Sequence, residues 1–152
     1  MWDPETNFYH DLDKDGNRLP EKTIAGFWPL LAEIPNADKA DCLVDHINNP
    51  DTFGTDHPFP SLSRDSAHFD EKGNEYCGSV FPAFNFMIIK GLEKYNEFVF
   101  ARECAITLSE RFQKSSPHSF LQKYVKKTRN SLTATAPANC DDTAKIRLQN
   151  IP

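Results

Sequence analysis

One stretch of the chain, residues 75–95, limits the fold more than any other. It reads EYCGSVFPAFNFMIIKGLEKY and begins with a short turn built on Gly78 and Ser79. Apolar side chains cover nearly every face of the helix that follows, namely Phe81, Phe84, Phe86, Met87, Ile88, Ile89 and Leu92. A helix that is apolar all round has to be covered all round, by a thick core or by lipid. The run is too short and ends too polar to span a bilayer. The sequence therefore predicts an inner helix of a layered helical protein.

A second long helix is predicted over residues 97–113. Its apolar side chains form a single stripe, made of Phe98, Ala101, Ala105, Leu108 and Phe112. A helix with one apolar stripe covers a core with that face and leaves the other to water. Because only a short break separates the two helices, we expect an antiparallel hairpin in which the 82–95 helix is the more buried.

Two shorter segments precede these helices. Residues 36–48 carry an apolar stripe at helical spacing, and Asn36 is a suitable capping residue at their start. Residues 23–32 are apolar but contain Pro29, and proline suits only the first turn of a helix. Residues 23–32 are therefore limited to a helix start or an irregular turn.

The N-terminal residues 2–16 predict a β-hairpin or an extended arm that includes an aspartate-rich turn. The letters DLDKDG at residues 11–16 also match the opening of an EF-hand calcium loop. However, Lys22 stands where that loop needs its bidentate glutamate, and Arg18 stands where it needs an apolar side chain. An aspartate-rich turn without a metal is the preferred interpretation.

A long segment without regular structure is predicted over residues 50–79. It contains several aromatic side chains, which are rare in disordered segments. A loop of this length in a compact domain is usually functional or disordered, so we expect a packed, functional loop. Residues 119–152 differ from the rest, and they predict a divergent helix near residues 120–127 followed by a loose tail.

The bulk composition excludes several classes of function. The 152 residues are enough for one domain with a core. The net charge of −5 comes without a basic stripe, which argues against nucleic acid as a partner. No membrane span, metal site or cofactor motif is predicted. The cysteines Cys42, Cys77, Cys104 and Cys140 are far apart and predict neither a zinc site nor a disulfide framework. Since the N-terminus has no signal-peptide pattern, a cytoplasmic location is expected if the chain is complete.

Several short motifs, taken in order, resemble part of the six-hairpin glycosidases. They read FYHD at residues 8–11, GFWPLLA at 26–32, PSLSRD at 60–65, EYCGSVF at 75–81, NF at 85–86 and KGLEKY at 90–95. The chain is most similar to glycoside hydrolase family 63 and the mannosylglycerate-hydrolase-like group, with trehalases as more distant relatives. The resemblance implies a largely all-α chain that is a fragment of an (α/α)6 toroid, with a partial glycosidase-like domain over residues 1–118.

The resemblance also implies an inverting hydrolase, which uses one carboxyl group as acid and another as base. In such enzymes the acid comes before the part of the sequence that resembles Trp2. The base corresponds to residues 130–140, which contain no carboxylate in this chain. We therefore expect the chain to contain no catalytic residue and to be inactive alone. Two aromatic residues, Tyr76 and Phe81, stand where the family has tryptophans.

The resemblance places a carbohydrate-binding site around the turn at Gly78. Aromatic side chains would form apolar floors for sugar rings, and polar ones would converge on their hydroxyl groups. The candidates are Trp28, His57, Ser63, Arg64, Tyr76, Gly78, Phe81 and Asn85. Apolar helix faces left exposed by an incomplete toroid would also favour self-association.

Two further hypotheses remain beside the hydrolase fragment. The chain could be a non-catalytic helical module that binds carbohydrate or another partner, as the missing carboxylates suggest. A related toroid of sugar epimerases would need histidines on inner helices. His46 is the candidate for that role, and it is expected to face solvent beside Asp45.

Overall fold

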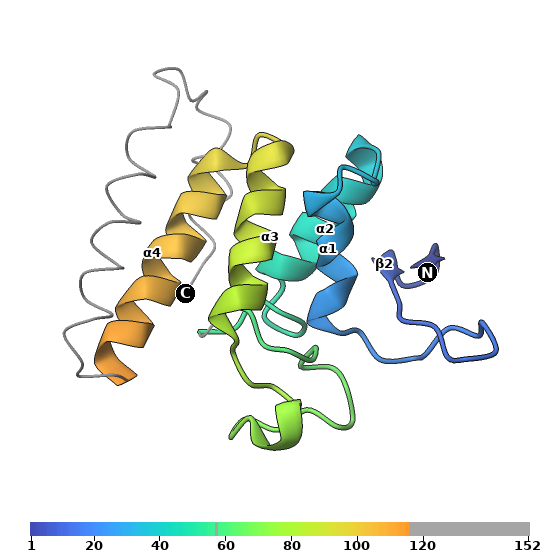
Figure 1. Ribbon diagram of the computed structural model, residues 1–152, viewed down its shortest axis with the longest axis horizontal. Helices are drawn as coiled ribbons and strands as arrows, with labels where there is room; N and C mark the ends of the chain where they lie inside the picture. Colours follow the sequence, from blue (N-terminus) through green and yellow to red (C-terminus); the bar gives the residue numbers. More distant parts are fainter. Residues whose placement is uncertain (57, 116–152) are drawn as a thin grey trace. The chain divides into compact units, whose positions relative to one another are not determined.

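The computed structural model describes residues 1–56 and 58–115, and these are mostly helical (Figure 1). The chain divides into two compact units, Met1–Asn96 and Glu97–Pro152. The helix predicted near residues 120–127 and the tail after it lie outside the described residues, as does His57. Within the described ranges, no helix combines the length and the apolar character that crossing a membrane requires.

The first unit starts with a small antiparallel hairpin of β1 (Trp2–Asp3) and β2 (Phe8–Tyr9). The predicted hairpin is therefore present, but it closes before the aspartate-rich turn. That turn forms a second loop, in which an isolated bridge joins Leu12 to Arg18. The Asp13 carboxylate accepts hydrogen bonds from the backbone of Asp15 and Asn17, at 2.9 and 2.8 Å. An aspartate that binds nearby backbone N–H groups stabilises a turn without any metal.

Three short elements form the scaffold after the hairpin. A 3-10 turn, η1 (Ile24–Phe27), leads into α1 (Trp28–Leu31), and Pro29 occupies the first turn of this helix as its fixed φ requires. The next helix is α2 (Ala37–Asn48), and its buried side is Ala40, Leu43, Val44 and Ile47. The predicted cap is confirmed, because Asn36 Oδ1 accepts the Lys39 backbone N–H at 3.1 Å.

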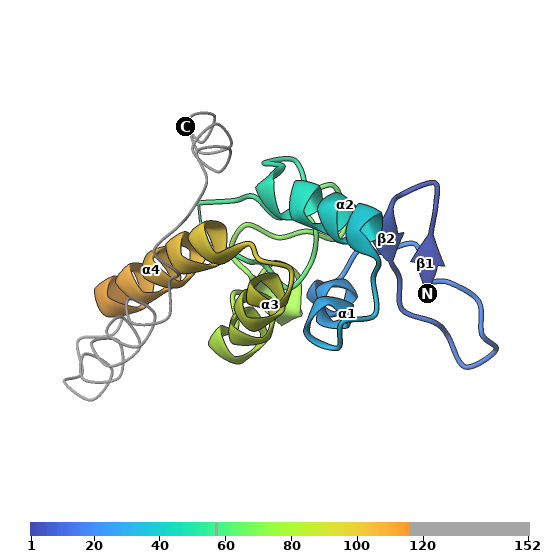
Figure 2. The same cartoon turned by 90° about the horizontal axis from the view of Figure 1, so that it is seen from above.

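The helix predicted at residues 82–95 is α3 (Pro82–Lys94). In both views α1 and α3 lie side by side, and α2 lies in a second layer (Figures 1 and 2). The close approach needs a glycine at position 91. A Cβ there would lie 2.8 Å from Leu30 Cβ and 2.9 Å from the Leu31 nitrogen, so a larger residue would push α1 away.

The described residues do not cover α3 on all sides. Its buried positions are Asn85, Ile88, Ile89, Gly91 and Leu92, whereas the Phe86 side chain is 58% exposed. The expectation of all-round burial is therefore wrong for the part of the chain that is described. A second long helix, α4 (Phe98–Ser115), belongs to the other unit and buries Ala101, Cys104 and Ala105. Packing of α3 against α4 as a hairpin stays a prediction.

Three fully buried phenylalanines join the hairpin, η1 and the long loop. Phe27 meets Phe8 and Phe53 edge to face, with ring centroids 5.1 and 4.8 Å apart. Phe53 belongs to the segment 50–79, which contains only the 3-10 turn η2 (Asn74–Tyr76) as a regular element among its described residues. Edge-to-face rings of this kind stabilise a core beyond the area they bury. The predicted packing of this loop is confirmed.

Candidate functional site

Four aromatic rings from three elements form a continuous row, which we call the aromatic row. Trp28 of α1 contacts Phe84 of α3 at 5.6 Å between ring centroids. Phe84 contacts Phe81 at 5.3 Å, and Phe81 is stacked on Tyr76 at 5.2 Å with an angle of 19° between the rings. The first three rings are half-buried, and Tyr76 at the end of the row is 71% exposed. A row of this kind offers an apolar surface with an open end.

Phe84 is the member of the row that the sequence did not predict as a site residue. Its helical spacing suggested only a contribution to the core. The signal that could have found it is its position three residues after Phe81, because residues i and i+3 of a helix lie on the same face. The indole N–H of Trp28 is buried, and the described residues offer it no hydrogen-bond acceptor.

The backbone that presents Tyr76 is unusual, and we call residues 76–79 the aromatic turn. Tyr76 has a φ of +67°, which few residues other than glycine adopt, and Gly78 has a φ of +123°. A Cβ at Gly78 would lie 2.5 Å from the Asp70 carbonyl oxygen. Only glycine fits there, so the structure gives the predicted site residue Gly78 a steric role.

The described polar residues that were predicted to bind sugar instead form hydrogen bonds or ion pairs within the protein. Asn85 is fully buried. Its amide Nδ2 donates to the carbonyl oxygens of Phe59 and Phe81, at 3.1 and 3.0 Å, and its Oδ1 accepts the Phe59 N–H. Ser63 is also fully buried, and its hydroxyl donates to Asp65 Oδ1 at 2.6 Å. Arg64 is exposed, and its guanidinium lies 3.3 Å from Glu71 Oε1.

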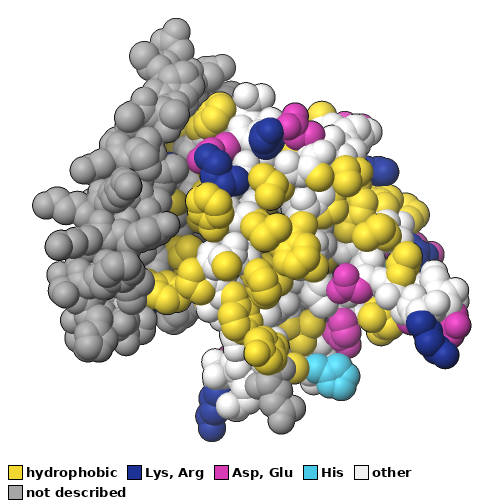
Figure 3. Space-filling model, viewed as in Figure 1, with side chains coloured by type: hydrophobic (Ala, Val, Ile, Leu, Met, Phe, Trp, Pro, Cys, Tyr) yellow, Lys and Arg dark blue, Asp and Glu magenta, His cyan; other side chains and the backbone are white. Residues whose placement is uncertain are grey.

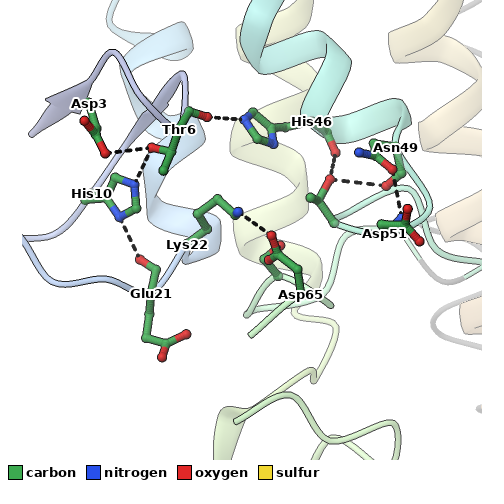
Figure 4. Close-up of polar contacts among 11 residues, drawn as sticks. Asp3, Thr6, His10, Glu21, Lys22, His46, Asn49, Asp51 and Asp65 are labelled. Carbon is green, nitrogen blue, oxygen red and sulfur yellow. Dashed lines mark hydrogen bonds and ion pairs between the residues drawn. The ribbon is translucent and has the colours of Figure 1, made fainter. Parts of the chain in front are cut away.

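A polar cluster ties the hairpin to α2 (Figure 4). His46 Nε2 donates to the Thr6 carbonyl oxygen at 2.9 Å, and its ring packs edge to face on Phe8. The expectation that His46 faces solvent is therefore wrong, because contacts from the distant hairpin cover it. His10 is buried with its Nε2 2.8 Å from Thr6 Oγ1 and its Nδ1 3.2 Å from the Glu21 carbonyl oxygen.

Local contacts lower the pKa of two aspartates of the loop, Asp65 and Asp70. Burial alone would raise the pKa of Asp65, but hydrogen bonds from Lys22 and Ser63, with the Lys22 charge, outweigh it and hold the pKa below its usual range. Hydrogen bonds from the Lys72 backbone and the Asn74 amide lower the pKa of Asp70 in the same way. A carboxyl group that donates a proton in catalysis needs a raised pKa. Neither residue has the environment of a general acid.

Metal chemistry has no visible support in the described residues. Residues 1–56 and 58–115 contain no group of three histidine, cysteine or carboxylate side chains that could hold a metal ion. The thiol of Cys104 is buried, and burial raises its pKa to about 12. A thiol with such a high pKa is protonated at neutral pH and is neither a ligand nor a nucleophile.

The family model for the mannosylglycerate hydrolase MGH1-like glycoside hydrolase domain matches residues 1–135. The chain belongs to this family, which confirms the resemblance seen in its motifs. The proposed division of the chain at residue 118 stays a prediction.

Two curated proteins are similar in sequence to this chain. An uncharacterized protein of Borreliella burgdorferi is 44% identical over 106 residues, which are 70% of this chain and 22% of that protein. A mannosylglycerate hydrolase of Thermus thermophilus is 31% identical over 117 residues, which are 73% of this chain and 27% of the enzyme. The chain thus spans about a quarter of the length of these relatives.

Solved structures confirm the fold. The GH63 mannosylglycerate hydrolase from Thermus thermophilus in complex with glucose superposes with a TM-score of 0.63 and 30% identity, covering 72% of this chain and 28% of the enzyme. The same enzyme in complex with Tris and D-glycerate gives the same TM-score over 27% of its length. The chain has the fold of part of a helical toroid of this type.

Proposed function

We propose that this chain forms part of the carbohydrate-binding surface of an inverting glycoside hydrolase, with mannosylglycerate, an α-glucoside or a trehalose-like sugar as substrate. The observation that carries the proposal is the aromatic row, which ends in the exposed ring of Tyr76. Sugar rings present apolar C–H faces that pack on aromatic side chains, while their hydroxyl groups need polar partners. The complexes of the Thermus thermophilus enzyme with glucose and with D-glycerate support this class of ligand.

Within this proposal the described residues bind and do not transfer protons. Inverting hydrolysis needs one carboxyl group that donates a proton and another that activates water. The pKa of Asp65 and that of Asp70 are lowered by local hydrogen bonds, so both groups are charged and occupied. We infer that the catalytic pair belongs to other parts of a full-length enzyme and that this chain alone hydrolyses no glycoside.

A turnover assay tests the predicted inactivity. The purified chain is incubated with mannosylglycerate, α-glucosides and trehalose, and released sugar is measured. No release is expected, because loss of either carboxyl group lowers the rate by orders of magnitude. Turnover that disappears in an Asp65→Asn or Asp70→Asn variant would refute the inference and place a catalytic carboxylate in the loop.

The second candidate function is a non-catalytic module that binds carbohydrate without hydrolysis. Its support is the same aromatic row, combined with the occupied carboxylates of the loop. Weak binding of D-glycerate, mannose and glucose is expected in either case, and it would appear as shifts of the Tyr76 and Trp28 signals in NMR titrations. The non-catalytic module would be favoured if the isolated chain bound sugar but had no effect on the activity of a full-length hydrolase.

We also propose that exposed apolar helix faces promote self-association of this chain. Hydrophobic side chains gather over α1 and α3 on the face that Figure 3 presents, and Phe86 is 58% exposed. Exposed apolar surface of this kind is usually covered by a partner. This chain spans about a quarter of the length of its relatives. In those proteins the remaining three quarters are a candidate to cover these apolar helix faces.

One pair of variants separates binding from association. Tyr76→Ala removes the exposed end of the aromatic row and should abolish the sugar-induced shift of the Trp28 signals without changing the oligomeric state. Phe86→Ala, the same change at an exposed aromatic ring outside the row, should reduce association in analytical ultracentrifugation and leave sugar binding intact. If Tyr76→Ala bound the sugars as well as the unchanged chain does, the row would not be the binding surface.

A further inference from the structure

Ser61 lies beside the aromatic turn. Its hydroxyl forms hydrogen bonds with the residues before and after Cys77. Ser61 Oγ donates to the Tyr76 carbonyl oxygen and accepts the Gly78 backbone N–H at 3.1 Å. A serine hydroxyl has one proton and two lone pairs, so it makes both bonds at once. Alanine at this position would lose both.

The backbone of Ser61 is itself fixed to the scaffold. Its N–H donates to the Ser79 carbonyl oxygen at 2.8 Å, and its carbonyl oxygen accepts the Ile24 N–H at 2.9 Å. Ile24 begins η1, which leads directly into α1 and Trp28. Ser61 therefore connects the two ends of the aromatic row, one through its backbone and the other through its hydroxyl.

The aromatic turn needs such a connection because of its backbone conformation. Tyr76 holds a φ of +67°, and a bulky residue keeps a positive φ only where its surroundings fix it. Bonds within the loop supply part of this support, since Cys77 N donates to Asn74 O at 2.9 Å and Asp70 N donates to Cys77 O at 2.6 Å. These bonds join residues 70–77 to one another, whereas the Ser61 hydroxyl joins them to a residue whose carbonyl oxygen accepts the Ile24 N–H of η1.

We propose that Ser61 is a positioning residue, which fixes the aromatic turn so that the Tyr76 ring stays stacked on Phe81 and faces the sugar. Its effect on sugar affinity rests on the carbohydrate-binding function proposed above. Its effect on the turn does not depend on that function. The sequence alone does not predict this role for Ser61, because the two groups that its hydroxyl binds lie at a distance along the chain.

The test compares three variants of the full chain by NMR. Ser61→Ala removes the hydroxyl, Ser61→Thr keeps it, and Ser66→Ala removes a control hydroxyl of the same loop that accepts the nearby His68 N–H at 3.1 Å. In Ser61→Ala the Gly78 amide should exchange with solvent about tenfold faster, the change expected for one lost hydrogen bond. The shift that the Phe81 ring imposes on the Tyr76 ring protons should decrease. Affinity for D-glycerate or mannosylglycerate should fall by about tenfold or more, because the variant loses both hydrogen bonds of the Ser61 hydroxyl.

Ser61→Thr should restore the Gly78 exchange rate, the Tyr76 ring shifts and the affinity, and Ser66→Ala should leave all three unchanged. Unaltered Gly78 exchange in Ser61→Ala would overturn the proposal, and so would faster exchange with unaltered affinity. If the unchanged chain bound no sugar, the carbohydrate-binding function would fail, and exchange and ring shifts would decide the role of Ser61. Should Ser61→Ala not fold, Ser61→Cys takes its place, since a thiol is only a weak donor and acceptor.

Discussion

Replacement of Asn85 by leucine is the sharpest test of how α3 and the long loop are held together. The side chain of Asn85 is fully buried and makes three hydrogen bonds to backbone groups, two to the peptide groups of Phe59 and one to Phe81 O. Phe81 O keeps the bond from the Asn85 backbone at 3.0 Å. The substitution therefore leaves two buried groups without this partner, the N–H and the carbonyl of Phe59.

The expected loss follows from these two groups. An unsatisfied buried donor or acceptor costs about 1–3 kcal/mol, and the apolar leucine side chain recovers part of the total. We expect the free energy of unfolding to fall by about 3 kcal/mol, a large share of the roughly 5–15 kcal/mol that stabilises a domain. The melting temperature should fall by about 6–12 °C for a protein of this size.

Urea denaturation followed by circular dichroism measures this loss. The matched control is Asn48→Leu, because Asn48 is exposed and its amide donates to Val44 O of its own helix at 3.1 Å. The control should stay within about 0.5 kcal/mol of the unchanged protein. If Asn85→Leu were as stable as the control, the three bonds would not hold the loop, and a direct role of Asn85 in sugar binding would regain support.

Three further perturbations test the scaffold. Gly91→Ala should lower the free energy of unfolding by about 1–3 kcal/mol in urea denaturation, since the added Cβ would lie 2.8 Å from Leu30 Cβ; an unchanged midpoint would mean that the helices separate freely. Asn36→Ala should cost about 1 kcal/mol through loss of the α2 cap, and a neutral result would show that the cap is not used in solution. Burial lowers the pKa of His46 from its ordinary 6.5, so the unfolded chain binds more protons. Stability from this group should be complete above about pH 6.5 and decline as the pH falls through the lowered pKa, whereas His46→Gln should show a flatter profile in melting temperatures measured against pH.

Local signals in the sequence predicted most of the helical scaffold. Asn36 starts α2 because a cap and the stripe that follows it lie within a few residues of each other. Glycine at position 78 predicted a turn, and glycine is the residue that fits there; its place in a binding site stays a prediction. Signals of this kind depend only on neighbours along the chain, which a sequence displays directly.

The remaining features depend on contacts between distant segments. His46 was expected in water, but Thr6 and Phe8 of the hairpin cover it. Asn85 has the same polarity whether it faces a sugar or the Phe59 backbone, so composition and spacing alone could not tell the two apart. Phe84 joins the row only because α1 places Trp28 beside it.

The loop that carries the aromatic turn has a consequence for how this family can diversify. Its bonds between Asp70 and Cys77, Gly73 and Asp70, and Cys77 and Asn74 run within the loop. A loop that closes on itself can change in sequence without disturbing the helices beside it. Substitution within the loop can therefore exchange the ring that ends the aromatic row, while Gly78 keeps its steric role. The same property makes residues 70–77 a natural segment for grafting a loop of different sequence onto this scaffold.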